Sequence, residues 1–267
     1  MRFVPLFLAQ LFVAAPIAAH EFWISPKDYI IDPQDQLVAD IRVGQDFKGN
    51  ASGYLPPRFV RFDLVQGDDL VPVEGAMGDR PALQMQAPGE GLVTVVYQTT
   101  DSRLTYSEWE KFVNFVTHKD LAWALEEHAE RGLPQTGFRE VYSRYGKSLM
   151  AVGAGAGADQ EVGLLTEIVS LANPYTDPLP QGLPVRVLYE GAPRAFTQIE
   201  VFQKAPDDTV SVATYRTDAA GVANVPVKPG HEYLVDSVVI RGLVPEAEGD
   251  PVWESLWASL TFEFPAE

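Results

Sequence analysis

Short apolar runs separated by turn residues cover most of the chain, and they predict β-strands because many of the residues in these runs are β-branched or aromatic. In the first part these runs occupy residues 29–31, 37–43, 58–65, 82–85 and 91–98. In the last part they occupy residues 185–189, 196–203, 210–215, 222–226, 232–240 and 257–264. The pattern predicts a mainly β protein with two β-sandwich regions, 20–104 and 160–267, of immunoglobulin-like or carboxypeptidase-regulatory-like type.

The region between the predicted sandwiches, 105–159, has a different pattern. Apolar residues recur at near-helical spacing from Ser107 to about Arg131, and Gly132 and Pro134 end the pattern, which predicts one helix or two short ones. Residues 138–150 fit either a strand edge or an irregular segment. The Gly/Ala-rich run at 152–158 lacks the Lys-Ser/Thr of a phosphate loop, so it predicts a flexible surface loop or linker.

The last predicted strand has two apolar faces. Leu256, Leu260 and Phe262 fall on one face, and Trp253 and Trp257 fall on the other. Tryptophan is too large and apolar to be left in solvent without cost, so we expect the second face to pack against another element, such as the helical segment.

The first 19 residues have the features of a signal peptide. Arg2 precedes an apolar run at 3–13, and small residues dominate 14–19. Cleavage after Ala19 would make His20 the first residue of the mature protein. No later segment approaches the length of a transmembrane helix, so we expect an exported protein of the periplasm with no membrane insertion of the mature chain.

Composition excludes several function classes. The full chain has a formal net charge of −17, and removal of Arg2 with the signal peptide changes it to −18. Such a surface repels nucleic acid and anionic lipid and attracts cations without specificity. The chain has no Cys, which excludes disulfides, thiolate metal sites and Cys nucleophiles.

Four stretches resemble a family of bacterial periplasmic proteins of otherwise unknown function that are labelled as the periplasmic component of a cobalt/nickel ABC-type transport system. They are AHEFW (19–23), EVYSRYGKSL (140–149), GHEYLVD (230–236) and WESLWASLTF (253–262). The resemblance implies a nickel or cobalt ion as the ligand and a membrane ABC-type metal transporter as the partner. Residues 217–236 also resemble carboxypeptidase-regulatory-like repeats, which supports the second sandwich but implies no activity.

Histidines are the candidate ligands for such an ion. A processed His20 offers its α-amine and its ring Nδ1, which together close a six-membered chelate, and one further His would complete a three-nitrogen plane suited to Ni(II) or Cu(II). We consider His118 and His231 as the second ligand. Each of these residues also has a reading without a ligand role. His20 could be a chance His at the start of a strand, His118 a solvated helix residue and His231 a turn residue. His128, flanked by Glu127 and Glu130, is predicted to be a surface residue.

Enzymatic motifs are absent from the sequence: it has no nucleophile elbow, HExxH or Walker loop. We therefore expect a non-enzyme. Two further hypotheses stay open, a structural or protein-interaction module without a ligand, and a copper oxidase that uses His20 in a histidine brace. Asp68/Asp69 and Asp207/Asp208 are predicted to be solvated surface. In the stretch 142–148 we expect the aromatics to pack, and Arg144 and Lys147 to bind a buried carboxylate.

Overall fold

The computed structural model describes residues 20–266 and confirms a mainly β protein with a sandwich-like arrangement. The predicted signal peptide, 1–19, lies outside the described residues. The strands are, in chain order, β1 (Glu21–Pro26), β2 (Ile30–Ile31), β3 (Gln36–Gln45), β4 (Lys48–Ser52), β5 (Phe59–Gln66), β6 (Asp69–Pro72), β7 (Leu83–Gln86), β8 (Gly91–Thr99), β9 (Ser102–Thr105), β10 (Arg139–Val152), β11 (Thr166–Ser170), β12 (Leu183–Tyr189), β13 (Ala192–Pro193), β14 (Gln198–Lys204), β15 (Val210–Arg216), β16 (Val222–Val225), β17 (His231–Gly242) and β18 (Trp253–Phe264).

Two helices follow β9, as the near-helical spacing predicted. They are α1 (Trp109–His118) and α2 (Trp123–Glu130), and a short 3₁₀ helix, η1 (Pro56–Arg58), precedes β5. After α2 the chain reverses at Gly132, whose φ of 64° is a conformation that glycine adopts without a steric penalty. No helix among residues 20–266 is both long enough and apolar enough to cross a lipid bilayer.

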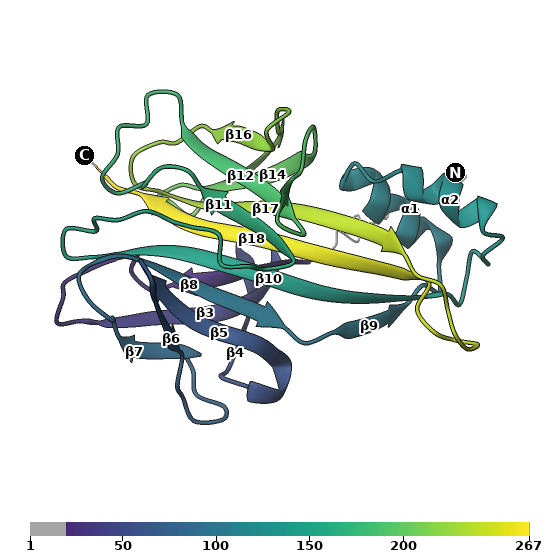
Figure 1. Ribbon diagram of the computed structural model, residues 1–267, viewed down its shortest axis with the longest axis horizontal. Coiled ribbons are helices and arrows are strands. Elements are labelled where there is room, and N and C mark those ends of the chain that lie inside the picture. Colours follow the sequence, from purple (N-terminus) through teal and green to yellow (C-terminus); the bar gives the residue numbers. More distant parts are fainter. Residues whose placement is uncertain (1–19, 267) are drawn as a thin grey trace, which may run out of the picture.

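A ten-stranded sheet runs through the molecule. Its main path is β15-β14-β17-β18-β10-β8-β5-β6, and β2 and β9 also pair with β10. One smaller sheet contains β1, β3, β4 and β7, and the other contains β11, β12, β13 and β16. Figure 1 shows the long strands β10, β17 and β18 across the middle, with β12 and β16 above them and β3, β4 and β7 below. The two sandwich regions therefore share one sheet.

Strand β10 covers most of residues 138–150, for which the sequence predicted either a strand edge or an irregular segment. It is a central strand, parallel to β18 over Glu140–Ser148 and antiparallel to β8 over Leu149–Val152. All residues from Tyr145 to Val152 are buried. A strand buried on both faces shows no alternation of apolar and polar residues, which explains why its pattern was ambiguous.

Each sandwich has its own apolar core. The first core joins side chains of β1 and β3 to β5, β8 and β10, with Ile24, Leu37 and Val95 fully buried. The second joins β11, β12 and β16 to β14, β17 and β18, with Val185 and Phe262 fully buried. Both cores use β8 and β10, so the two sandwiches are packed on a shared wall.

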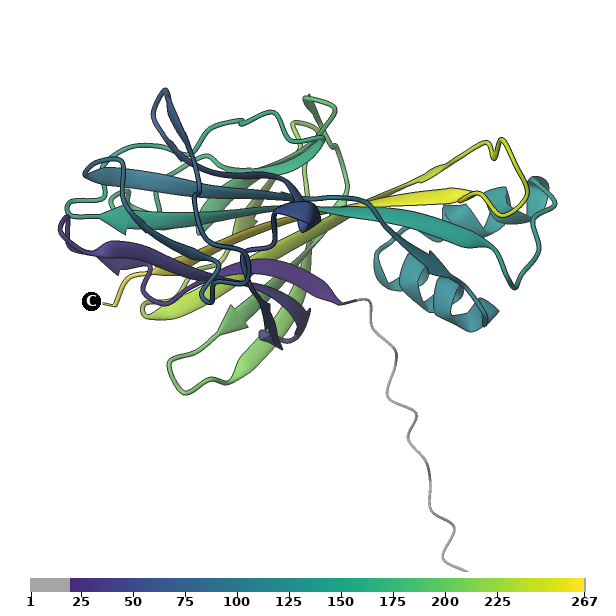
Figure 2. The same ribbon diagram turned by 90° about the horizontal axis from the view of Figure 1, so that it is seen from below.

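The helices cover one end of the long strands, and the prediction about β18 is confirmed there. Trp253 and Trp257 pack in a cluster with α1 and α2, whereas Leu260 and Phe262 belong to the second sandwich core. The rings of Phe115 and Trp257 stack with their centroids 5.4 Å apart. Figure 2 shows α1 and α2 beside the extended ends of β10, β17 and β18.

The Gly/Ala-rich segment is held by hydrogen bonds, in contrast to the predicted flexible loop. The side-chain amide of Asn173 donates to the carbonyls of Gly155 and Gly157, and Leu92 N donates to Ala156 O at 2.8 Å. The buried Asn173 and the neighbouring strand β8 therefore fix this segment against the second sandwich.

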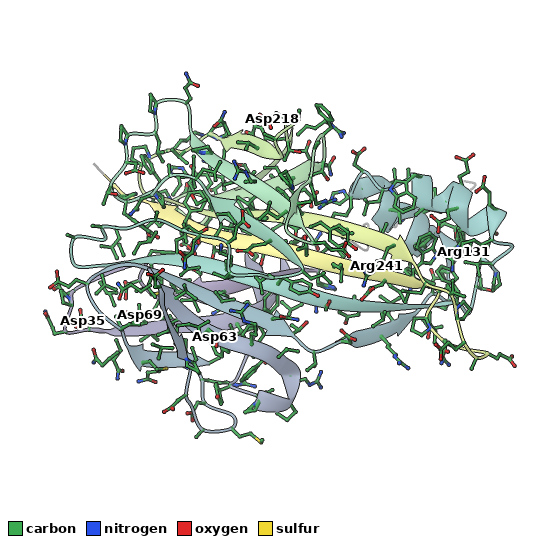
Figure 3. The ribbon with its side chains drawn as sticks, in the orientation of Figure 1. Asp35, Asp63, Asp69, Arg131, Asp218 and Arg241 are labelled. Carbon is green, nitrogen blue, oxygen red and sulfur yellow. The ribbon has the colours of Figure 1, made fainter. Side chains whose placement is uncertain are left out.

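The acidic pairs in turns lie on the surface, as predicted. Asp68, Asp69, Asp207 and Asp208 are all exposed. Figure 3 places Asp35, Asp63 and Asp69 on the part of the molecule far from the helices, whereas Arg131 and Arg241 lie near the helical end. The candidate chemistry described below lies between the N-terminal strand and that helical end.

Candidate functional site

His20 lines a pocket whose other walls come from β9 and the turn after it, from α1, and from β10 and β18. It directly precedes β1, and its side chain is exposed. Figure 2 shows the beginning of β1 next to the helical pair. The pocket has a volume of about 250 Å³ and is lined by His20, Leu104, Thr105, Tyr106, Ser107, Lys111, Phe115, Glu140, Tyr142, Arg144 and Trp257.

Four of the eleven residues that line this pocket are aromatic: Tyr106, Phe115, Tyr142 and Trp257. Phe115 and Trp257 form one stacked pair, and the guanidinium carbon of Arg144 lies 4.8 Å from the centre of the Tyr142 ring. The Arg144 Nε atom is buried and has no hydrogen-bond partner among the described residues. Burial lowers the pKa of the Arg144 guanidinium, and the nearby Tyr142 and Asp236 partly offset that effect.

A buried carboxyl group, Glu140, forms part of the pocket lining. It accepts hydrogen bonds from the Tyr106 hydroxyl at 2.7 Å and from the Ser255 hydroxyl, which in turn accepts one from Trp257 Nε1 at 2.9 Å. Burial raises the pKa of Glu140 to about 7, against the opposing effect of these two donors. This carboxyl group therefore keeps its proton to a higher pH than an ordinary glutamate does.

A buried charge cluster connects α1 to the sheet, and its charges act on Glu21, the residue after His20. Lys119, just after α1, forms ion pairs with Glu200 on β14 and with Asp236 on β17, the latter at 2.7 Å. Burial alone would lower the pKa of Lys119, but the two carboxylates outweigh it and raise the pKa. Burial raises the pKa of Glu21, on β1, to about 7; the charge of Lys119 opposes this rise, and those of Asp236 and Glu200 add to it.

The structure places His118 at this cluster. Its side chain is 56% exposed, and its Nε2 lies 2.6 Å from Glu200 Oε1. The contact is not directed well enough to count as a hydrogen bond. The other ring nitrogen, Nδ1, forms no hydrogen bond within residues 20–266, so it is available to bind an ion.

His231 lies elsewhere. It begins β17, and its Nδ1 donates to Pro229 O at 2.8 Å. Asp236, which belongs to the charge cluster, follows five residues later on the same extended strand, a separation of roughly 17 Å at 3.3 Å per residue. Of the predicted second ligands, His118 therefore lies in the charge cluster that acts on Glu21, the residue after His20, whereas His231 lies away from that cluster.

The prediction that His128 is a surface residue is wrong. His128 is 1% exposed and stacks on Trp253 with ring centroids 6.3 Å apart. Trp253 Nε1 donates to His128 Nδ1 at 3.0 Å, and His128 Nε2 donates to Pro134 O at 3.0 Å. Both ring nitrogens are occupied, and burial lowers the pKa of the imidazole. His128 is a neutral core residue that holds α2 against β18.

Metal-binding capacity within the described part of the chain is limited. Among residues 20–266, no three His, Asp or Glu side chains converge in a way that would hold an ion by themselves. An ion at His20 would therefore need the α-amine of the processed chain, which is a ligand only after cleavage, in addition to side-chain donors.

Comparison with protein families adds one finding. A family model described as a domain of unknown function (DUF4198) matches residues 17–241. The chain belongs to the DUF4198 family. A comparison with curated proteins gave no match. The predicted resemblance is thus confirmed as membership of a family of unknown function, and the cobalt/nickel transport label of this DUF4198 chain remains a prediction.

The sequence predicted the roles of some polar residues of this DUF4198 protein and missed the roles of others. The stretch 142–148 was expected to supply cations for a buried carboxylate, and Lys147 does so, at 2.9 Å from both Asp159 and Glu167. Arg144, from the same stretch, has no carboxylate partner within residues 20–266. The sequence did not indicate the buried roles of Lys119, Glu140 and Glu200, because the partners of these residues are distant in the sequence.

The carboxyl group of Glu140 gives this DUF4198 protein a testable pH dependence. Its pKa in the folded state, about 7, is above the ordinary value of 4.5, so the folded chain binds more protons than the unfolded chain between these pH values. Stability should therefore fall as the pH rises through this window. Glu140→Gln mimics the protonated acid and does not titrate. As the pH rises from 5 to 8, its free energy of unfolding should therefore rise relative to that of the parent by on the order of 3 kcal/mol.

Urea unfolding of both proteins at several pH values measures this effect. Glu21 titrates in the same window in both proteins, so only the difference between them reports on Glu140. A parent and a variant whose unfolding free energies stay parallel across the window would show that Glu140 is not neutralised by folding.

Proposed function

We propose that the mature protein begins at His20 and binds a nickel or cobalt ion in the periplasm for delivery to an ABC-type importer. The observation that carries this proposal is the position of His20, which is exposed, lines the pocket and directly precedes β1. Once the signal peptide is removed, the α-amine and the ring Nδ1 of His20 chelate the ion. The cargo is then held at the surface, where a partner can reach it.

His118 is the best candidate for the third nitrogen. Glu200 contacts its Nε2, as carboxylates commonly do with the outer nitrogen of a metal-binding imidazole, and this leaves Nδ1 for the ion. The buried Lys119 holds Glu200 in place. Three nitrogens suit Ni(II) and Cu(II), and a ligand set with so few protein donors suits an ion that must be released.

Two other functions remain as alternatives. A copper oxidase with a histidine brace would use the same His20 and His118, and the aromatic walls of the pocket give that reading some support. A structural or interaction module would use neither. Metal binding separates the module from the other two, and copper-dependent oxidation separates the oxidase from the delivery protein.

Substitutions of the three histidines test the proposal. His20→Ala should weaken Ni(II) binding the most, since it removes the imidazole from the chelate. His118→Ala should cost about 10-fold to 100-fold in affinity, as loss of one nitrogen would, whereas His231→Ala should have no effect. Calorimetric titration of Ni(II) into each protein measures the affinities. Equal Ni(II) affinities in all three variants would mean that the acidic surface alone attracts the ion, and they would favour the interaction module.

A further inference from the structure

The pocket below His20 has features that metal delivery alone does not use. It extends past the imidazole to Tyr142, Trp257 and Phe115, and Arg144 lies on its wall. Its volume of about 250 Å³ is smaller than that of typical drug-sized sites, so it fits a molecule of about one ring.

Arg144 is the residue that points to the charge of such a molecule. Its Nε atom is buried without a partner, and no carboxylate of residues 20–266 forms an ion pair with it. Some partly buried arginines have such partners, as Arg42 has Asp40 at 2.6 Å, whereas Arg186 Nε is, like that of Arg144, buried without a hydrogen-bond partner among the described residues. Arg144 differs from Arg186 in that it lines the pocket. A buried N–H without an acceptor is costly, and a ligand carboxylate would offset that cost through charge-assisted hydrogen bonds.

The aromatic walls indicate the rest of the molecule. Phe115 and Trp257 form a stacked surface, and Tyr142 lies under the Arg144 guanidinium. A flat ring placed against these side chains gains aromatic contact and apolar burial. Lys111, which also lines the pocket, is already paired with Glu108 at 2.7 Å, so it is a weaker candidate for the carboxylate.

We propose that this pocket binds a small aromatic carboxylate that also coordinates the ion at His20, so that the protein takes its metal as a chelate. Arg144 binds the carboxylate, the aromatic walls hold the ring, and a ring heteroatom together with one carboxylate oxygen completes the coordination that the protein leaves open. The metal half of this inference rests on the proposed function. The carboxylate half rests on the pocket alone.

Pyridine-2-carboxylate (picolinate) is a suitable probe, because its ring nitrogen and carboxylate chelate Ni(II). Pyridine-4-carboxylate (isonicotinate) is the matched control, with the same ring and charge but no chelating geometry. The mature protein is titrated with Ni(II) alone, with the preformed 1:1 Ni(II)–picolinate complex, and with Ni(II) plus isonicotinate. The complex should bind roughly 10-fold to 100-fold more tightly than Ni(II) alone, and isonicotinate should give no such gain.

Two variants locate the effect. Arg144→Gln should reduce the affinity for the complex to that for Ni(II) alone, whereas Lys111→Gln, which removes a cation from the pocket rim, should retain the full gain. Thermal unfolding of both variants verifies that they fold. Equal affinity for the complex and for free Ni(II), or a gain that survives Arg144→Gln, would overturn this inference. Failure of the proposed function would give a different result, namely Ni(II) binding that does not depend on His20.

Discussion

Replacing Lys119 with Met is expected to lower the free energy of unfolding by about 3–5 kcal/mol, the usual effect of removing one partner from a buried ion pair. Lys119 is 5% exposed, and its ammonium group contacts Glu200 and Asp236, both 2% exposed. Met has a similar length and fills the space, so the loss would come from electrostatics more than from packing. Two carboxylates would be left buried on adjacent strands without a fixed cation.

The same cluster fixes how the helices are attached. Lys119 ends α1, and its ammonium group lies 5.1 Å from the centre of the Trp257 ring, on the face of β18 that the helices cover. Glu200 and Asp236 are paired across β14 and β17. Loss of Lys119 should therefore loosen the helical pair first, which the fluorescence of Trp253 and Trp257 would report.

Lys111→Met is the matched control, since it makes the same chemical change on the same helix. Lys111 pairs with the exposed Glu108, and such surface pairs contribute roughly 0–1 kcal/mol. Adding Glu200→Gln and Asp236→Asn to Lys119→Met should restore part of the lost stability, because it removes the unpaired charge. Urea unfolding measures all four proteins. Similar losses for Lys119→Met and Lys111→Met would contradict the role assigned to the cluster.

The fold could be predicted from sequence as far as local patterns determine it. The apolar, β-branched runs at 37–43 and 91–98 identified β3 and β8, and the helical spacing with Gly132 and Pro134 identified α1 and α2. The sequence did not identify β10 as a central strand, because β10 is buried on both faces and is paired with β18, more than 100 residues away. Its Lys147 is compatible with the core only because Asp159 and Glu167 reach it.

The candidate site was less predictable, for a physical reason. His20 was identified by its position after the predicted signal peptide, which is a local feature of the sequence. His128 was misplaced because its partner Trp253 lies 125 residues further along the chain, and only the fold shows that the pair is buried. Arg144 was expected to bind a carboxylate of the protein. It instead faces a pocket whose walls come from β10, β18 and the helical segment.

In the proposed function, the α-amine and the ring of His20 together hold the ion. A protein with one Gly added before His20 keeps the imidazole but separates the amine from it, so the six-membered chelate cannot form. The fold should not change, because the side chain of His20 is exposed and the cores lie elsewhere. The second donor of a chelate binds at a high effective concentration, so Ni(II) affinity should fall by roughly 10²–10⁴-fold.

The decisive measurement is a Ni(II) titration of both proteins at slightly acidic pH, where Ni(II) does not displace the amide proton of the added residue. Intact mass first verifies that the reference protein begins at His20, and circular dichroism verifies that the two folds agree. We expect tight one-to-one binding by the protein that starts at His20 and a loss of two or more orders of magnitude in affinity in the Gly-extended protein. Equal affinities, or a mature chain that begins several residues from His20, would contradict it.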